Sequence, residues 1–272
     1  MKEHDFITIL ETDIARIRAI GVGSMGVKMV RMLSGNMPSI TCHEVAYDPK
    51  CESPVQTTEL LSEVQESELV FIITAFEDGY CGAVVENVGQ AARNAGVLTL
   101  ALIPDSQLLS LAQLTASVDA VFAISEDSMS DKRDPAHIQS SEEVNPMLHM
   151  ITVITKMITL RNYIGIDFAD VVTIMRIGNI GRLGVGMALS PDKSIDAALI
   201  ALEQLVSQGI SPLDAKGVLI VFEGSSHSTL DNIFDAHAVI ISHVAENANT
   251  LIGFVEDDRL GDNIRLSIMQ VW

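Results

Sequence analysis

The chain has 272 residues and a formal net charge of −19 at pH 7. Such a charge opposes binding to nucleic-acid phosphates and to anionic lipid headgroups, so no nucleic-acid role and no direct membrane binding are expected. The length favours two domains. The three cysteines are scattered and match no metal-ligand spacing, so we predict no metal site of side chains and a cytoplasmic protein with reduced thiols.

The first predicted element is a strand over residues 14–22 that breaks at a glycine turn. Gly21, Gly23 and Gly26 form the pattern GxGxxG, with Ser24 inside the turn, and a helical pattern follows. Strand, glycine turn and helix together are the context in which backbone N–H groups and a helix N-terminus bind phosphate. The alternative is that the glycines only permit a tight turn and close packing.

A second strand is predicted over residues 41–47, and Asp48 follows it. An acidic residue at this distance can reach a ribose hydroxyl in dinucleotide-binding folds. The turn and the segment VAYDP resemble the cofactor-binding start of the β-hydroxyacid dehydrogenases. However, neither Lys156 nor Lys193 has the setting of the catalytic lysine of that family, and no Gly-rich substrate loop is found. Non-enzymatic binding of NAD or of another nucleotide stays open as an alternative.

The next segments predict a parallel sheet. A short polar connection with one helix leads to the apolar run ESELVFIITAF, which is typical of a strand buried on both faces. A helix closed by Gly96 and a further strand follow, so a right-handed crossover is expected. The predicted strands after this helix cover residues 97–103 and 118–125, and the polar run 125–144 is a surface loop or short helix.

Residues 145–176 are the stretch around which the chain is organised. Asn145 followed by Pro146 is a strong helix opening. The helix that follows is apolar around much of its circumference, so we expect it to lie between two packed layers. Asp167 and Asp170 then stand three residues apart near the start of another helix, where the dipole favours negative charge.

The remaining residues predict a second α/β unit. Histidines 227, 237 and 243 do not share a helix face, so a metal site there is not expected. The predicted helices cover residues 194–208, closed by Gly209, and 230–247, and the predicted strands cover residues 217–222, 250–255 and 264–271.

Several segments, in the same order, resemble the FtsZ and tubulin superfamily, and FtsZ in particular. IRAIGVGSMGVKMV is similar to the family's IKVIGVGGGGGNAV, and GIDFADVVTIM is similar to its NLDFADV loop and the following helix. The segment from AKGVL to the final strand is similar to the closing domain. The resemblance covers nearly the whole chain, and DFADV together with AKGVL is its specific part.

The resemblance implies an α/β fold with a Rossmann-like parallel-sheet domain, a long central helix and a smaller α/β domain with a mixed sheet. We place these at residues 1–140, 141–160 and 161–272. The family's nucleotide lies in the loops of the first domain. By position, Asp167 and Asp170 are the acids that complete the hydrolytic site of a neighbouring subunit, where a carboxylate can orient and polarise water. The alternative is that Asp170 caps a helix and Asp167 bonds loop amides.

The nucleotide loops depart from the family pattern. Where the family has GGGTGTG, this chain has EDGYCGA, which keeps Gly79 and Gly82 but adds Glu77, Asp78 and Tyr80. Each carboxylate near a triphosphate costs on the order of 1 to 4 kcal/mol. Mg²⁺ could offset part of this repulsion. Binding of GTP or GDP is therefore disfavoured, although it is not excluded.

Two further positions bear on the nucleotide and on partners. The family's aromatic residue that stacks on guanine is matched by Ser140, and Asn145 could contact a base edge, although helix capping explains Asn145 equally well. The sequence stops at Trp272, without the linker and terminal peptide of FtsZ, so we do not expect membrane tethering through that peptide.

These observations predict a divergent FtsZ-like cytoskeletal protein with a degenerate GTP site. It would assemble into filaments by itself or with an authentic FtsZ, and its GTP hydrolysis would be weak or lost. One alternative is an active GTPase with a rebuilt pocket. The other is the non-enzymatic nucleotide or NAD binder based on the glycine turn and Asp48.

Overall fold

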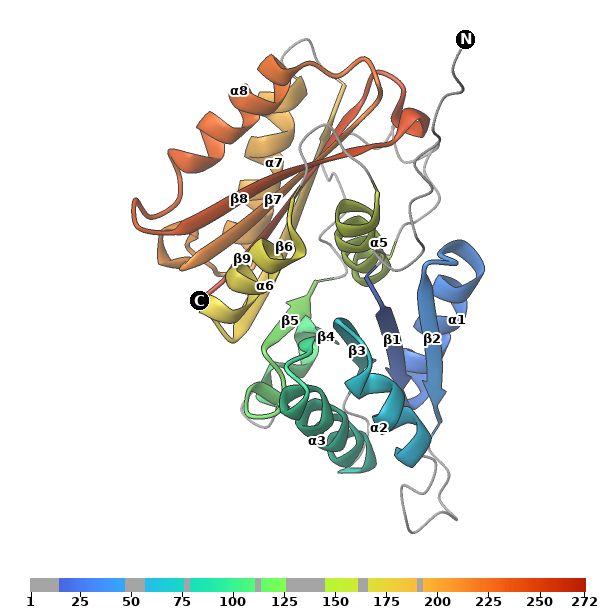
Figure 1. Cartoon of the computed structure of the whole chain (residues 1–272). Coiled ribbons are helices and arrows are strands. Elements are labelled where there is room, and N and C mark those ends of the chain that lie inside the picture. Colours follow the sequence, from blue (N-terminus) through green and yellow to red (C-terminus); the bar gives the residue numbers. More distant parts are fainter. Residues whose placement is uncertain are drawn as a thin grey trace, which may run out of the picture.

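The strands of the protein form one sheet, with the helices packed on its faces (Figure 1). The computed structural model describes residues 15–46, 57–75, 79–110, 114–125, 145–160, 166–189 and 193–272. Within this part of the chain the sheet has nine strands in the order β2-β1-β3-β4-β5-β6-β9-β7-β8. We call β1 to β5 with their helices the first half and β6 to β9 with theirs the second half.

The first half is the predicted parallel sheet, because each of its neighbouring strands pairs in parallel. Helix α1 packs on one face of the sheet, and helices α2 and α3 pack on the other. The strands are β1 (Ile17–Val22), β2 (Ile40–Val45), β3 (Leu69–Thr74), β4 (Leu98–Pro104) and β5 (Ala120–Ile124), and the helices are α1 (Gly23–Asn36), α2 (Thr57–Gln65), α3 (Gly79–Asn94) and the 3₁₀ helix η2 (Asp105–Ser110).

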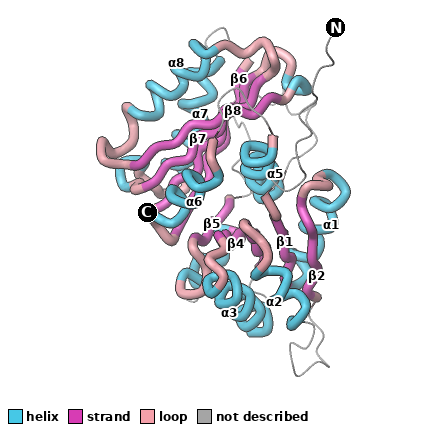
Figure 2. The backbone as a smooth tube through the Cα atoms, in the orientation of Figure 1, coloured by secondary structure: helices cyan, strands magenta, loops and turns pink. Residues whose placement is uncertain are grey.

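Helix α5 (Pro146–Thr159) lies between the two halves, as its apolar sequence predicts (Figure 2). One continuous apolar core joins Ile151 and Ile154 of α5 to Phe71 and Phe122 of the first half, and it extends to Met269 of the second half. A helix that is apolar on several sides can bury all of them only between two layers. The expected central helix is confirmed.

The second half is a mixed sheet, also as predicted. Strand β9 runs antiparallel to β6 and β7, whereas β7 and β8 are parallel. Helices α7 and α8 cover one face, and α5 and α6 cover the other. The strands are β6 (Ile180–Ala188), β7 (Gly217–Gly224), β8 (Asn249–Glu256) and β9 (Ile264–Val271), and the helices are α6 (Phe168–Ile177), α7 (Lys193–Ser207), α8 (Leu230–Ile241) and the 3₁₀ helices η5 (Pro212–Asp214) and η6 (Asp258–Leu260).

Helix α8 is shorter than the sequence predicts, because it ends at Ile241 and not at residue 247. Ser242 Oγ donates to the carbonyl oxygen of Val239 at 2.7 Å, and Nδ1 of His243 lies 2.8 Å from the same oxygen. Side chains that bond nearby backbone groups compete with the continuing helix. The apolar spacing that predicted the longer helix does not report this competition.

Strand β6 is the one strand of the described chain that the sequence did not predict. It contains Gly181, Gly184 and Gly186, and glycine disfavours strands. The glycines are required by packing, because a Cβ at Gly184 or Gly186 would overlap the backbone of α7 at Ala201 or Ala197. The missed strand joins the halves through two residue pairs with β5, Val121 with Ile180 and Phe122 with Gly181. The division into 1–140, 141–160 and 161–272 stays our proposal.

The close approach of α7 to β6 predicts that Gly186→Ala is destabilising. The added methyl group must push α7 away from the strand, and overpacking of this kind costs about 1–3 kcal/mol. Gly35→Ala is the matched control, because Gly35 lies in α1 with no atom near its missing Cβ. There we expect a gain of up to ~1 kcal/mol from helix propensity. Urea unfolding measures both, and equal effects of the two variants would contradict the packing role of Gly186.

Candidate functional site

The glycine turn connects β1 directly to α1. Gly23 begins the helix with φ of +75°, a conformation that favours glycine. A Cβ at Gly21 would overlap the carbonyl of Gly26, and a Cβ at Gly26 would overlap the carbonyl oxygen of Ile73 in β3. Close packing therefore requires glycine at both positions. This packing is compatible with phosphate binding, because it fixes the turn at the carboxyl end of β1.

The start of α1 has no acidic side chain in its first turn. Its N-cap residue, Val22, supplies no side-chain hydrogen bond, and Ser24 is exposed there. The first N–H groups of a helix have no partner within the helix, so phosphate can accept from them. Phosphate binding at this turn stays a prediction from the sequence.

Helix α3 starts beside this turn. Strands β1 and β3 are parallel neighbours, so α1 and α3 both begin at the carboxyl edge of the sheet. Gly79 and Gly82 lie in the first turn of α3, and Cys81 between them is buried in the apolar core. The structure thus brings the two predicted glycine segments to one edge, the usual ligand edge of such sheets.

Several of the predicted nucleotide-site residues lie outside the described part of the chain. They are Asp48, Glu77, Asp78 and Ser140, and for Gly79 and Tyr80 only the backbone is described. The effect of the acidic segment on nucleotide binding therefore stays a prediction from the sequence.

Asn145 caps helix α5. Its Oδ1 accepts from the backbone N–H groups of Met147 at 2.9 Å and Leu148 at 3.3 Å, and Pro146 takes the first helical position. The capping interpretation is confirmed. Contact with a nucleotide base stays a prediction for this residue.

Asp167 and Asp170 lie together at the start of α6. Asp167 is the N-cap, since its Oδ1 accepts from the N–H of Ala169 at 3.1 Å, and Asp170 lies in the first helical turn. The alternative in which Asp170 is the cap is therefore wrong. Both residues are exposed. The positive end of the helix dipole favours both charges there, so two carboxylates are held in place where a second molecule can reach them.

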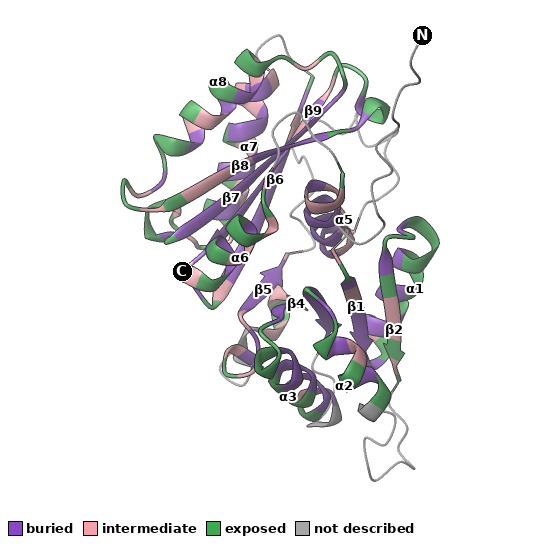
Figure 3. Ribbon diagram, viewed as in Figure 1, coloured by how far each residue is buried: buried purple, intermediate pink, exposed green. Residues whose placement is uncertain are grey.

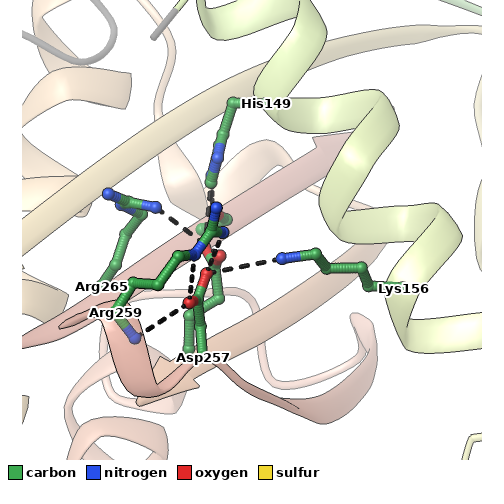
Figure 4. A network of polar contacts seen from close by, with 7 residues as sticks. His149, Lys156, Asp257, Arg259 and Arg265 are labelled. Atoms are coloured by element: carbon green, nitrogen blue, oxygen red, sulfur yellow. Dashed lines mark hydrogen bonds and ion pairs between the residues drawn. The ribbon is translucent and has the colours of Figure 1, made fainter. Parts of the chain in front are cut away.

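A buried polar cluster between α5 and the second half was not predicted (Figure 4). His149 and Lys156 are seven residues apart, so they extend from one face of α5. His149 Nε2 lies 2.8 Å from Ser267 Oγ and 3.3 Å from Glu223 Oε2. Lys156 Nζ lies 3.4 Å from Asp257 Oδ2. Two ionisable residues in a helix that is otherwise uncharged were the available signal, but their partners are distant in sequence.

Charged groups of both signs complete this cluster. Arg259 forms a two-point bond with Asp257, with distances of 2.7 and 2.6 Å. The hydrogen bond from Arg259 holds the pKa of Asp257 well below its usual range. Arg265 Nη1 lies 3.7 Å from Glu223 Oε1. Burial raises the pKa of Glu223 to about 7 and lowers that of His149 to about 3.

Two sequence comparisons find similarity to FtsZ. Residues 180–271 match the model of the FtsZ family, C-terminal domain. The cell division protein FtsZ of Mycoplasmopsis pulmonis (strain UAB CTIP) is 24% identical over 224 residues, which are 78% of this chain. The chain is thus similar to the FtsZ family model in its C-terminal part and to this FtsZ over most of its length. It spans only 57% of the length of the M. pulmonis protein, so the activity of that protein is not transferred here as a whole.

Solved structures confirm the expected fold. An empty FtsZ dimer of M. jannaschii superimposes with a TM-score of 0.79 at 19% identity, over 96% of this chain and 89% of that one. CetZ2 from Haloferax volcanii, solved as a GTPγS-bound protofilament, superimposes with a TM-score of 0.67 at 13% identity, over 94% and 92% of the two chains. Identities this low show the fold alone.

The described residues contain neither a membrane-spanning helix nor a cluster of metal ligands. In that part of this FtsZ-like chain, no helix is both long and apolar enough to cross a bilayer. Nor does the same part bring together three or more His, Cys, Asp or Glu side chains that could hold a metal ion.

The different positions of the two acids predict different effects on folding. Asp167→Ala removes the N-cap of α6 and should cost about 1 kcal/mol of unfolding free energy. Asp170→Asn keeps the side-chain size at an exposed position and removes only the charge that the helix dipole favours, so it should cost about 0.3–0.5 kcal/mol. Urea unfolding of both variants tests this, and a larger loss for Asp170→Asn would show that Asp170 has a structural role that the geometry does not assign.

Proposed function

We propose that this chain is an FtsZ-like cytoskeletal protein of the cytoplasm. It assembles end to end, by itself or with an authentic FtsZ, and its own GTP hydrolysis is weak or absent. The observation that carries the proposal is the exposed pair Asp167 and Asp170 at the start of α6, within a fold matched over 96% of the chain by an FtsZ that was solved as a dimer. The GTPγS-bound protofilament of CetZ2 supports the same arrangement for a second relative.

The two carboxylates act on a neighbouring molecule in this proposal. In their own subunit they lie at the positive end of α6, and Asp167 also bonds Ala169. An exposed carboxylate at a subunit contact can orient and polarise water next to a phosphate held by the adjacent subunit. When the adjacent subunit is another copy of this chain, Asp167 and Asp170 serve as contact residues only. When it is an authentic FtsZ with bound GTP, they act in trans.

Exposed apolar side chains on α8 support assembly. Leu230 and Phe234 are four residues apart on one helix face, and they are 56% and 60% exposed. Figure 3 shows that α8 carries exposed residues on its outer side while β7 is buried. Apolar groups that gather on a surface mark sites of protein contact.

Weak GTP binding follows from the segment EDGYCGA, which replaces the family's glycine-rich phosphate loop. Its carboxylates repel a triphosphate, and bound Mg²⁺ would offset only part of that repulsion. The second candidate is an active GTPase. It is favoured by the start of α1, where the N-cap residue Val22 makes no side-chain hydrogen bond and the first turn has no acidic residue, and the same feature would serve a binder of NAD.

Calorimetric titration with GTP, GDP and NAD, each with and without Mg²⁺, separates the candidates. We expect no saturable binding at micromolar ligand and no phosphate release above background. Micromolar GTP binding with phosphate release would establish the active GTPase in place of our proposal. Saturable NAD binding would favour the non-enzymatic binder of NAD.

Assembly is tested by sedimentation and electron microscopy, for the chain alone and mixed with the M. pulmonis FtsZ. We expect the chain in the pellet in at least one condition. In the mixture, Asp170→Asn should lower phosphate release severalfold relative to the unchanged chain, because one of the acids that act in trans is lost. A chain that stays monomeric at high concentration, with and without Mg²⁺ and GTP, and does not sediment with FtsZ would contradict assembly.

A further inference from the structure

Three buried side chains at the contact between α5 and the second half cannot all form good hydrogen bonds at the same time. His149 is 4% exposed, Glu223 is 3% exposed and Ser267 is fully buried. Nε2 of His149 has two neighbours, Ser267 Oγ at 2.8 Å and Glu223 Oε2 at 3.3 Å. A ring nitrogen carries either one hydrogen or one lone pair, so it serves one of them well.

The consequence falls on Glu223. While His149 bonds Ser267, Oε2 of Glu223 is buried without a hydrogen-bond partner. A buried carboxylate oxygen in this state is costly, whereas a protonated carboxyl group can donate to Nε2 of a neutral imidazole. The same three side chains therefore have two hydrogen-bonded arrangements, which differ by one proton.

Some of the charges around Glu223 raise the pKa of its carboxyl group and others lower it. The described groups that face it are Lys156 from α5, Arg265 from β9, Asp257 at the end of β8 and Arg259 from η6. Arg265 and Lys156 favour the ionised carboxylate, and Asp257 disfavours it. Lys156 and Arg259 both contact Asp257 directly, at 3.4 and 2.6 Å, so that carboxylate offsets only part of their positive charge. Burial nevertheless has the largest effect on the pKa of Glu223.

We propose that His149, Glu223 and Ser267 form a proton-dependent latch between α5 and the second half of the sheet. With a proton on Glu223, its carboxyl group donates to Nε2 of His149. When that proton passes to solvent, Nε2 accepts from the hydroxyl of Ser267 instead, and the carboxylate keeps only its long contact with Arg265. The attachment of α5 is then weaker, because a charged group is buried with one oxygen unpaired.

The pKa shifts place the switch near neutral pH. Glu223 has a raised pKa of about 7, so its stabilising contribution is complete below its ordinary value of 4.5 and is lost as pH rises through 7. His149 has a lowered pKa of about 3, so its contribution is complete above 6.5 and is lost as pH falls towards 3. Between pH 4.5 and 6.5 the folded pair holds one proton on the carboxyl group of Glu223. In the unfolded chain that proton is on the imidazole of His149.

The latch lies on the helix that contacts both halves of the molecule. Helix α5 also packs on the first half, so a looser attachment to the second half changes how firmly the halves are held relative to each other. The latch depends only on the contacts that α5 makes within its own chain. It would stand if the chain neither assembled nor bound nucleotide.

The first test compares the unfolding constant at pH 6 and pH 8 for the unchanged chain and for Glu223→Gln, which fixes the neutral form. With a folded pKa of about 7 for Glu223, the ratio of the unfolding constant of the unchanged chain to that of Glu223→Gln should rise about tenfold between these pH values. Glu246→Gln, at an exposed position, is the control, and its ratio should not change. A constant ratio for Glu223→Gln would overturn the proposal.

The second test distinguishes a latch from a merely buried acid. Ser267→Ala removes the competing hydroxyl, so Glu223 becomes the main partner of Nε2 and its titration midpoint, followed by carboxyl ¹³C NMR, should rise. In the unchanged chain the ¹⁵N signals of the His149 ring should shift with the same midpoint as Glu223. A midpoint unaffected by Ser267→Ala, or ring signals that do not follow Glu223, would show a single fixed arrangement. This test remains decisive if Glu223→Gln fails to fold.

Discussion

The burial of α5 on two opposite sides is the constraint on which the rest of the structure depends. Its apolar residues complete the cores of both halves, so neither half is closed without it. Polar groups on such a helix must find partners inside the protein. His149 does so with Glu223 of β7 and Ser267 of β9, and Lys156 does so with Asp257, which directly follows β8. The buried polar cluster is therefore a consequence of placing this helix in the middle of the molecule.

Local features of the sequence predicted most of the elements. Continuous apolar runs marked β3 and β4, and Asn145 with Pro146 marked the start of α5, because each signal depends on residues that are close together in the chain. The position of Asp167 and Asp170 beside α6 was found in the same way. Which of them is the cap was not, since either carboxylate could reach a free N–H group at that helix end.

Features that depend on distant residues were missed. Strand β6 is rich in glycine because α7 crosses it closely, and nothing within β6 itself reveals α7. His149 and Ser267 are separated by 118 positions, so only the fold shows that they meet. Gly21 and Gly26 serve close packing whether or not a phosphate binds, so the glycine pattern by itself does not distinguish packing from phosphate binding.

The connection between β5 and β6 consists of two residue pairs. So short a ladder gives the backbone little resistance to twisting along that line, and the angle between the halves is set mainly by side chains packed around α5. In an end-to-end polymer, a tilt of a few degrees at this line would recur in every subunit and accumulate with length. The straightness or curvature of such a polymer would then be decided inside each subunit as much as at the contacts between subunits.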